Sequence, residues 1–447
     1  MPAGHLDIAS LDLLREAVER LDRGFSDLPA FEESPVDQAA MRKVLLETAE
    51  RMHDNFPYFH PQYAGQMLKP PHPVARLAYA LAMYINPNNH ALDGGRASSQ
   101  MEKEAVAGIA RMFGWETHLG HLTGGGTMAN LEALWIAGQL RPDGVILASD
   151  QAHYTHRRIS GVLKLPFESV PTDRFARMDL NALEERLRRG GVGTVVATLG
   201  TTATGSVDTL PEILSLRERY GFRLHADCAY GGYYTLASNL APPARAAFNR
   251  LAEVDSIVID PHKHGLQPYG CGCVLFRDPG DGKFYKHDSP YTYFSSQELH
   301  LGEISLECSR PGAAAVALWA TQRVFPLEHG GEFSQMLDAC RKGALGLHET
   351  LKKEKRFLPA FSPELDIVVW ALRSDSATES SRRARVIFGQ AEKLGLHLAL
   401  AELPAKFFDG EWKDRAESVT ALRSVMMKPE HLGALPEIRR LVNRSLD

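Results

Sequence analysis

Cysteine is scarce in this 447-residue chain, which has five cysteines and no CxxC pair. An odd number of scattered thiols does not match the disulfide framework of a small secreted protein, so we expect free, buried thiols. Cys271 and Cys273 would share one face of a strand, but no second Cys/His pair with zinc-finger spacing accompanies them. We therefore predict no metal site.

Long apolar runs and a strong charge imbalance are also missing. The longest apolar stretch, residues 74–85, is interrupted by Arg76 and is shorter than the ~20 residues that span a bilayer. The N-terminus lacks a basic region followed by an apolar one, as a signal peptide would have. The formal charge of −5 predicts neither a nucleic-acid nor a membrane partner. We expect a cytoplasmic protein.

Helical patterns fill the beginning of the chain. Apolar residues recur at three- and four-residue spacing within 11–56, and further helices are predicted over 74–85 and 98–113. The intervening segment 56–73 is rich in proline and aromatic residues, which is typical of an ordered loop or arm. The pattern divides the chain into an N-terminal helical arm (1–85), a large domain (86–325) and a small C-terminal α/β domain (326–447).

Short β-branched runs then alternate with helical patterns. The runs lie at 144–148, 194–199, 222–226, 256–259 and 272–276. This alternation predicts an α/β fold, a mainly parallel sheet with helices on both faces. The connection between the last two strands is too short for a helical crossover, so we expect that edge strand to run antiparallel.

Gly124, Gly125, Gly126 and Thr127 precede a predicted helix. Backbone N–H groups, a hydroxyl and the helix dipole together form a suitable phosphate cradle. The segment matches neither GxGxxG nor a P-loop, so a plain tight turn is an equally good interpretation on this evidence alone.

Three further polar side chains follow predicted strands, at the edge where a parallel sheet binds its ligands. Asp227 is suited to pair with a cation, Lys263 to form a Schiff base, and His153 to stack on a planar group or transfer a proton. Each has an ordinary structural alternative: a turn-capping Asp, a solvated Lys and a hydrogen-bonded loop His. Together with the phosphate cradle they match what pyridoxal phosphate requires.

The blocks TGGGTMAN, SDQAHY, ATLGTTATGSVD, HADCAYGG and DPHKHG occur in an order and spacing that resemble group II pyridoxal-phosphate-dependent amino acid decarboxylases. The resemblance implies the type I, aspartate-aminotransferase-like fold with a seven-stranded sheet. It also implies that Lys263 bonds covalently to the cofactor, that Asp227 pairs with the pyridine nitrogen, and that His153 stacks on the ring. By the same resemblance, the phosphate is held by Gly126, Thr127 and His262, the ring is flanked by Thr202 and Ala229, and the substrate pocket is lined by Gln62 and Tyr63.

Two departures from the family's sequence pattern leave open which bond of the substrate is broken. Family members usually have Trp after the His-Lys pair, where this chain has His264-Gly265. This feature and the segment 308–312 (CSRPG) resemble instead the carbon–carbon lyases that cleave phosphorylated sphingoid bases. The leading interpretation is decarboxylation of an L-amino acid, and the sequence is compatible with an aromatic substrate side chain. The alternative is a retro-aldol lyase that acts on a β-hydroxy amine.

The segment 286–302 lies where the family has a catalytic loop, and it supplies Tyr291 and Tyr293 as candidate proton donors. An ordinary exposed loop is the alternative. Arg310 is a candidate ligand for a substrate carboxylate or phosphate, with a helix-start ion pair as its alternative. The resemblance also implies a homodimer with shared active sites, in which the N-terminal helices interlock.

Overall fold

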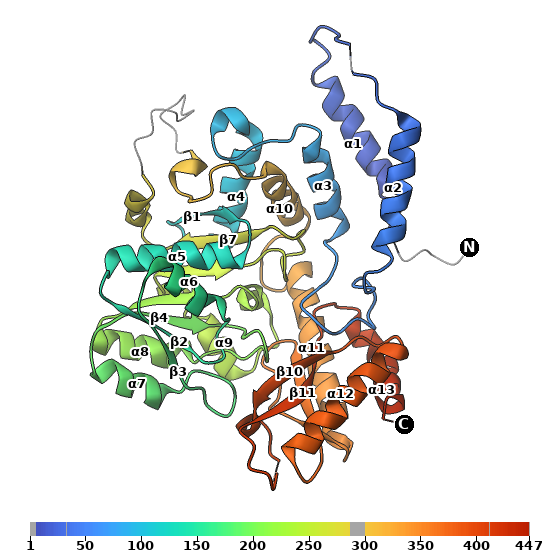
Figure 1. Ribbon diagram of the computed structural model, residues 1–447. Coiled ribbons are helices and arrows are strands. Elements are labelled where there is room, and N and C mark those ends of the chain that lie inside the picture. The colour runs from blue at the N-terminus through green and yellow to red at the C-terminus, as the bar shows by residue number, and fades with distance from the viewer. Residues whose placement is uncertain (1–5, 33, 287–299, 411, 447) are drawn as a thin grey trace.

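The chain folds around two β-sheets, the first built from strands within residues 119–276 and the second from strands within residues 357–425 (Figure 1). The computed structural model describes residues 6–32, 34–286, 300–410 and 412–446. The large sheet has seven strands in the order β1-β7-β6-β5-β4-β2-β3. They are β1 (Leu119–Thr123), β2 (Val145–Ser149), β3 (Phe167–Val170), β4 (Val192–Thr198), β5 (Arg223–Asp227), β6 (Ser256–Ile259) and β7 (Gly272–Phe276).

The strand directions agree with the predicted architecture. β2 to β6 run parallel, whereas β7 is antiparallel to both of its neighbours, β1 and β6. The short segment between β6 and β7 has no room for a crossover helix, so the chain reverses direction there. The seven-stranded, mainly parallel sheet and its antiparallel β7 are thus confirmed; β1 and β3 were not among the five predicted strands.

Helices cover both faces of the large sheet. Along β6, Val258 packs with α5, while Ile257 and Ile259 join the core on the opposite face. Both faces are dry, which explains the nearly continuous apolar sequence of the central strands. The helices of this part are α4 (Arg96–Met112), α5 (Gly126–Leu140), α6 (Thr155–Leu163), α7 (Leu180–Arg188), α8 (Leu210–Tyr220), α9 (Pro242–Phe248) and α10 (Gly312–Val324).

The second sheet is antiparallel, with the order β10-β11-β9-β8. The apolar runs 366–372 and 396–403 predict two of its strands, β9 and β10. The other two are less visible in the sequence, because β8 is only three residues long and polar residues are interspersed along β11. Its elements are α11 (Glu332–Lys353), β8 (Phe357–Pro359), β9 (Ile367–Leu372), α12 (Ala377–Lys393), β10 (Ala399–Pro404), β11 (Ser418–Val425) and α13 (His431–Arg444). The two sheets lie on either side of residue 325; the domain boundaries themselves stay a prediction.

Three helices precede the large sheet: α1 (Leu11–Arg23), α2 (Gln38–Met52) and α3 (Pro73–Met83). α3 packs on α10, whereas α1 and α2 form an arm at the side of the molecule (Figure 1). Neither α1 nor α2 has a buried residue. Across the described parts of the chain, no helix combines the length and apolar character needed to cross a bilayer.

Candidate active site

A cavity of about 620 Å³ opens at the carboxyl ends of the parallel strands. Parallel strands end at one edge of the sheet, so residues far apart in sequence converge there. All eight residues predicted to bind the cofactor line this cavity: Gly126, Thr127, His153, Thr202, Asp227, Ala229, His262 and Lys263. The structure therefore brings the predicted cofactor residues into one place.

The glycine-rich loop between β1 and α5 forms one wall. Gly125 has φ +146°, a conformation that side-chain-bearing residues rarely adopt. A Cβ on Gly126 would lie 2.6 Å from Asp260 Oδ2, so this position also requires glycine. α5 begins here without a side-chain cap. Gly124 N–H donates to the Glu307 carboxylate at 3.0 Å, which shows that the loop presents N–H donors to an anion.

Asp227 ends β5 and is almost fully buried. Its Oδ1 accepts a hydrogen bond from Ala229 N–H (3.1 Å), and its Oδ2 lies 2.8 Å from His156 Nε2. Burial acts to raise the pKa of this carboxyl, but the hydrogen bond and charge of His156 outweigh it and hold the pKa well below its usual range. Asp227 is therefore an ionised carboxylate facing the cavity.

Lys263 lies in the turn after β6. Its Nζ is 3.0 Å from Asp260 Oδ2, and the Asp260 carboxylate is buried. His262 Nδ1 is 2.8 Å from the Cys271 carbonyl, which fixes its ring. The Lys263 side chain is one-fifth exposed and borders the cavity.

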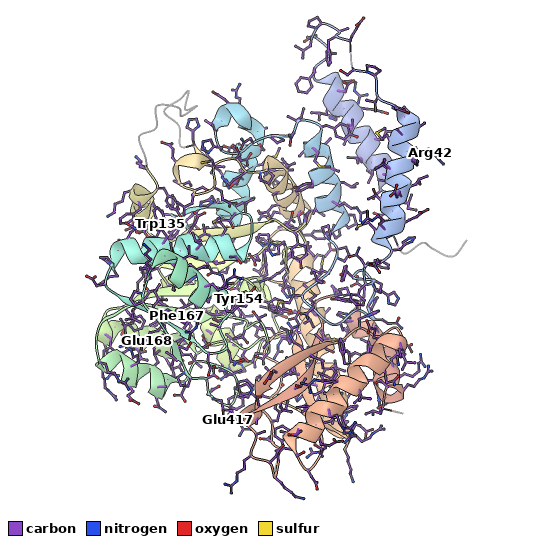
Figure 2. The ribbon with its side chains drawn as sticks, in the orientation of Figure 1. Arg42, Trp135, Tyr154, Phe167, Glu168 and Glu417 are labelled. Carbon is purple, nitrogen blue, oxygen red and sulfur yellow. The ribbon has the colours of Figure 1, made fainter. Side chains whose placement is uncertain are left out.

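His153 lies in the segment between β2 and α6, two residues before the helix begins. Its Nδ1 contacts Thr155 Oγ1 at 2.5 Å, and its ring lies 4.4 Å from that of Tyr154, which Figure 2 labels. Burial is the main cause that lowers the pKa of His153. The ring is therefore neutral near pH 7 and presents an uncharged flat face to the cavity.

Comparison with known proteins identifies the family. The family model described as "Pyridoxal-dependent decarboxylase conserved domain" matches residues 135–373, more than half of the chain. The chain belongs to the pyridoxal-dependent decarboxylase family. It is a pyridoxal-phosphate-dependent enzyme that decarboxylates an L-amino acid.

Individual relatives have decarboxylase names. An L-tyrosine decarboxylase of Enterococcus faecium is 29% identical over 470 aligned positions, covering 79% of this chain and 77% of that protein. An L-aspartate decarboxylase of Thermococcus kodakarensis is 29% identical, covering 64% and 73%. Among solved structures, Oryza sativa TDC with PLP and tryptamine has a TM-score of 0.78 at 16% identity, with both chains covered completely. Mouse CSAD has a TM-score of 0.78 at 20% identity, covering 98% and 99%. These structures show the shared type I fold.

The donors around the cavity fit the cofactor of this decarboxylase family. The uncapped start of α5 and the Thr127 hydroxyl provide donors for a phosphate, the His262 ring borders the same cavity, and Asp227 provides an anionic acceptor for a ring N–H. Thr198 Oγ1, buried at the end of β4 in the same cavity, has no hydrogen-bond partner within the described part of the chain. Such an unsatisfied hydroxyl is costly unless a bound group supplies a partner.

Three predicted substrate residues lie elsewhere in the decarboxylase. Gln62 and Tyr63 pair with the segment before β10, where the Gln62 carbonyl accepts from His397 N–H at 2.9 Å. Arg310 is buried, lies 2.9 Å from Glu102 and donates to the Leu122 carbonyl. These contacts match its ion-pair alternative, and its placement gives no support to a substrate-binding role. Tyr291 and Tyr293 lie outside the described residues.

Sequence reasoning missed two residues of this site. His156 is three positions after His153, within the first turn of α6, and Asp260 is three positions before Lys263. One helical turn or one tight turn therefore brings each beside a residue that was identified. Asp260 could have been identified from its place in the same turn as Lys263. The contact between His156 and Asp227 spans 71 positions, and only the fold reveals it.

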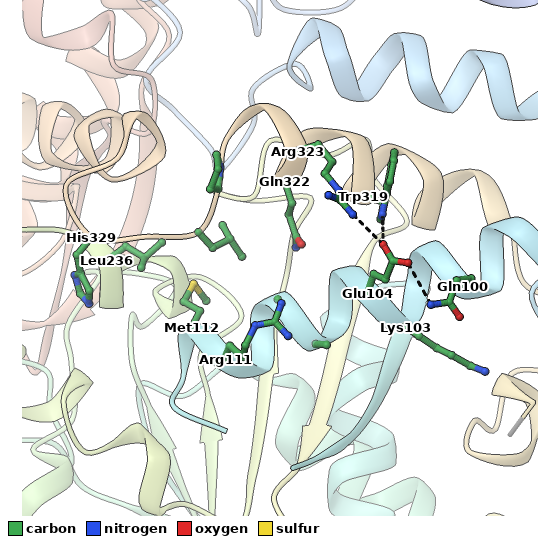
Figure 3. Close-up of a pocket in the computed structure, with 14 residues that line it drawn as sticks. Gln100, Lys103, Glu104, Arg111, Met112, Leu236, Trp319, Gln322, Arg323 and His329 are labelled. Carbon is green, nitrogen blue, oxygen red and sulfur yellow. Dashed lines mark hydrogen bonds and ion pairs between the residues drawn. The ribbon is translucent and has the colours of Figure 1, made fainter. Parts of the chain in front are cut away.

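A second groove, of about 950 Å³, lies between α4 and α10 (Figure 3). Glu104 is held there by Trp319 Nε1 (2.6 Å), Gln100 Nε2 (3.2 Å) and Arg323 (3.2 Å). None of the predicted site residues lines this groove. The larger of these two cavities is therefore not the one that the predicted site residues line.

Proposed function

We propose that Lys263, Asp227 and His153 form the catalytic centre of the decarboxylase. Their convergence with the glycine-rich loop on one cavity is the observation that carries this proposal. Lys263 holds the cofactor covalently, and Gly126, Thr127 and His262 bind its phosphate. Thr202 and Ala229 flank its ring. The cofactor, when bound, supplies the electron sink for the bond that breaks at the substrate Cα.

Each residue contributes through its own chemistry. The ionised Asp227 accepts a charge-assisted hydrogen bond from the ring N–H, which is worth about 1.5–3 kcal/mol. His156 keeps that carboxylate ionised and oriented. Neutral His153 covers one face of the ring without adding a repelling positive charge. The burial of Asp227 and His156 strengthens the interaction between them.

We further propose an aromatic L-amino acid as the substrate. Tyr154, Tyr230, Leu131 and Met128 give the cavity aromatic and apolar wall segments. The cationic or titratable bases in the described lining are Lys263, His153 and His262, all of which are assigned to the cofactor. An acidic side chain would therefore lack a free cation in this lining. The L-tyrosine decarboxylase name of a relative agrees with this choice, and the decarboxylase names favour it over carbon–carbon cleavage.

A substrate panel tests the proposal. The protein reconstituted with pyridoxal phosphate is incubated with L-tyrosine, L-phenylalanine and L-tryptophan, and in parallel with L-aspartate and L-glutamate. We expect equimolar carbon dioxide and amine from at least one aromatic substrate and a lower kcat/KM for both acidic ones. Turnover confined to acidic substrates would contradict the aromatic proposal. Aldehyde release without carbon dioxide, from a β-hydroxy amine, would instead establish the lyase alternative.

We also propose a homodimer in which the arm α1–α2 covers a second copy. α2 exposes Met41, Val44, Leu45 and Met52, each by more than two-fifths of its surface. So many exposed apolar residues on one helix mark a protein contact. A cytoplasmic location is proposed from the five free thiols, four of them buried.

Removing the apolar face of the arm is expected to separate the dimer. Val44→Asp together with Leu45→Glu would place two charges in the interface. Burial of such side chains contributes roughly 1.5–3 kcal/mol each, so the dissociation constant should rise by about 100-fold or more. Light scattering should show twice 49.4 kDa for the wild type and 49.4 kDa for the double variant at low micromolar concentration.

The matched control for this prediction is Lys43→Gln, on the same helix, which changes a charge without touching the apolar residues. It should keep the mass of the dimer. A wild-type protein that elutes as a single chain at all concentrations would refute the proposed assembly.

A further inference from the structure

His264 and Asp366 meet at the junction of the two sheets. His264 directly follows Lys263 in the turn after β6, and Asp366 directly precedes β9 of the small sheet. Both are almost fully buried, and His264 Nε2 lies 3.2 Å from Asp366 Oδ2. The two residues are 102 positions apart, so this contact joins the small domain to the lysine turn.

Asp366 also reaches the wall of the cavity. Tyr230 O–H donates to Asp366 Oδ1 at 2.6 Å, and Tyr230 lines the cofactor cavity. The ring of His264 packs edge-on against Tyr230 (4.8 Å) and Tyr234 (5.2 Å). Burial and the Asp366 charge raise the pKa of Tyr230 well above its usual range, so its hydroxyl remains a donor.

The surrounding groups keep Asp366 ionised. Burial acts to raise the pKa of Asp366, but His264, Tyr230 and Tyr234 outweigh it and lower that pKa. Burial in turn lowers the pKa of His264, against the charge of Asp366, which acts to raise it. The partly buried Lys69, the buried Arg423 and the buried thiol Cys340 also interact electrostatically with this carboxylate. Asp366 is thus a shared anion at this domain junction.

We propose that His264 and Asp366 are positioning residues that hold the Lys263 turn and Tyr230 in register with the cofactor cavity. The proposal rests on the role of Lys263 proposed above. One carboxylate, directly before β9, contacts the residue after Lys263 and accepts a hydrogen bond from Tyr230 in the wall of the site. A lysine whose turn is held in this way needs less rearrangement to reach a bound carbonyl group, since displacement by about 1 Å can cost about 100-fold in rate.

The test measures covalent capture of pyridoxal phosphate by the apoenzyme, followed by absorbance, together with kcat and KM of the reconstituted enzyme. Asp366→Asn keeps the shape and the acceptor for Tyr230 but removes the charge. His264→Phe keeps the ring packing but removes both nitrogens. We expect each variant to slow capture and to lower kcat by about 10- to 100-fold, with KM changed less, and the double variant to lose little more than either single one.

Asp338→Asn is the matched control, because Asp338 joins α11 to the segment 238–239 through Ser238 N–H (2.8 Å) and does not touch the lysine turn. It should lower the melting temperature and leave capture and kcat unchanged. If Asp366→Asn and His264→Phe behave like this control, the positioning role is wrong. If instead the wild type and Lys263→Ala capture the cofactor equally, the role of Lys263 itself fails, and the two failures are thereby distinguished.

Discussion

Lys263→Ala is expected to abolish covalent attachment of pyridoxal phosphate and to lower kcat by about four to six orders of magnitude, the scale on which a covalent catalytic group acts. The Lys263 amine borders the cavity in which the other cofactor residues converge, and alanine has no side-chain amine that could bond to the cofactor. The measurement is the absorbance band of the lysine-bound cofactor and its disappearance on borohydride treatment, compared with steady-state turnover.

Lys263→Arg is the matched control for folding. It keeps a positive charge beside the buried Asp260 but supplies no amine that can bond to a carbonyl carbon. We expect it to melt close to the wild type and to be as inactive as Lys263→Ala. A borohydride-sensitive band retained in the alanine variant would assign the covalent bond to another lysine.

Asp227→Asn should have the second-largest effect, lowering kcat by about 10²- to 10³-fold. The amide retains the size of the carboxylate but carries no charge to pair with a protonated ring nitrogen. Asp281→Asn is the control: Asp281 is also buried and pairs with Arg223 at the opposite end of β5 (2.7 Å). The control should reduce stability alone. Equal kcat in both variants would show that Asp227 has no special role.

The pH dependence should reveal the contribution of His156. With His156 present, the pKa of Asp227 is low, so its ionised form contributes stability above the unfolded-state pKa, and that contribution is lost only when the pH falls through the low folded-state pKa. In His156→Phe the burial effect is no longer opposed by this partner. We therefore expect the pKa of Asp227 to rise and the acidic limb of the kcat profile to move to higher pH. An unchanged profile would contradict this expectation.

Much of the fold followed from local patterns. The central strands β4, β5 and β6 are short apolar runs bounded by turns, and their positions were predicted to within a few residues. β1 and β3 were missed because His121 in the first and Glu168 and Ser169 in the second interrupt the apolar pattern. The His121 side chain is nevertheless buried, because Glu132 lies 2.9 Å from its Nε2. That partner comes from α5, which a strand pattern cannot reveal.

The residues of the candidate site were likewise predictable only where a local sequence motif marks them. Residues carried by a motif, such as Gly126 or Lys263, could be predicted as site residues because their chemistry is visible locally, and both line the cavity. The charge of Arg310 left two interpretations open, since a guanidinium suits a ligand and a buried carboxylate equally well. Only its neighbour Glu102, far away in sequence, distinguishes these environments.

The scarcity of cysteine, the mild charge and the short apolar runs excluded several classes of protein, and the ordered motifs indicated the cofactor, the fold and the reaction class. Tertiary structure decided which side chains meet: His156 with Asp227, and His264 with Asp366. The physical reason is that a hydrogen bond or ion pair depends on distances of about 3 Å, and such distances between remote residues exist only after the sheets and helices have packed.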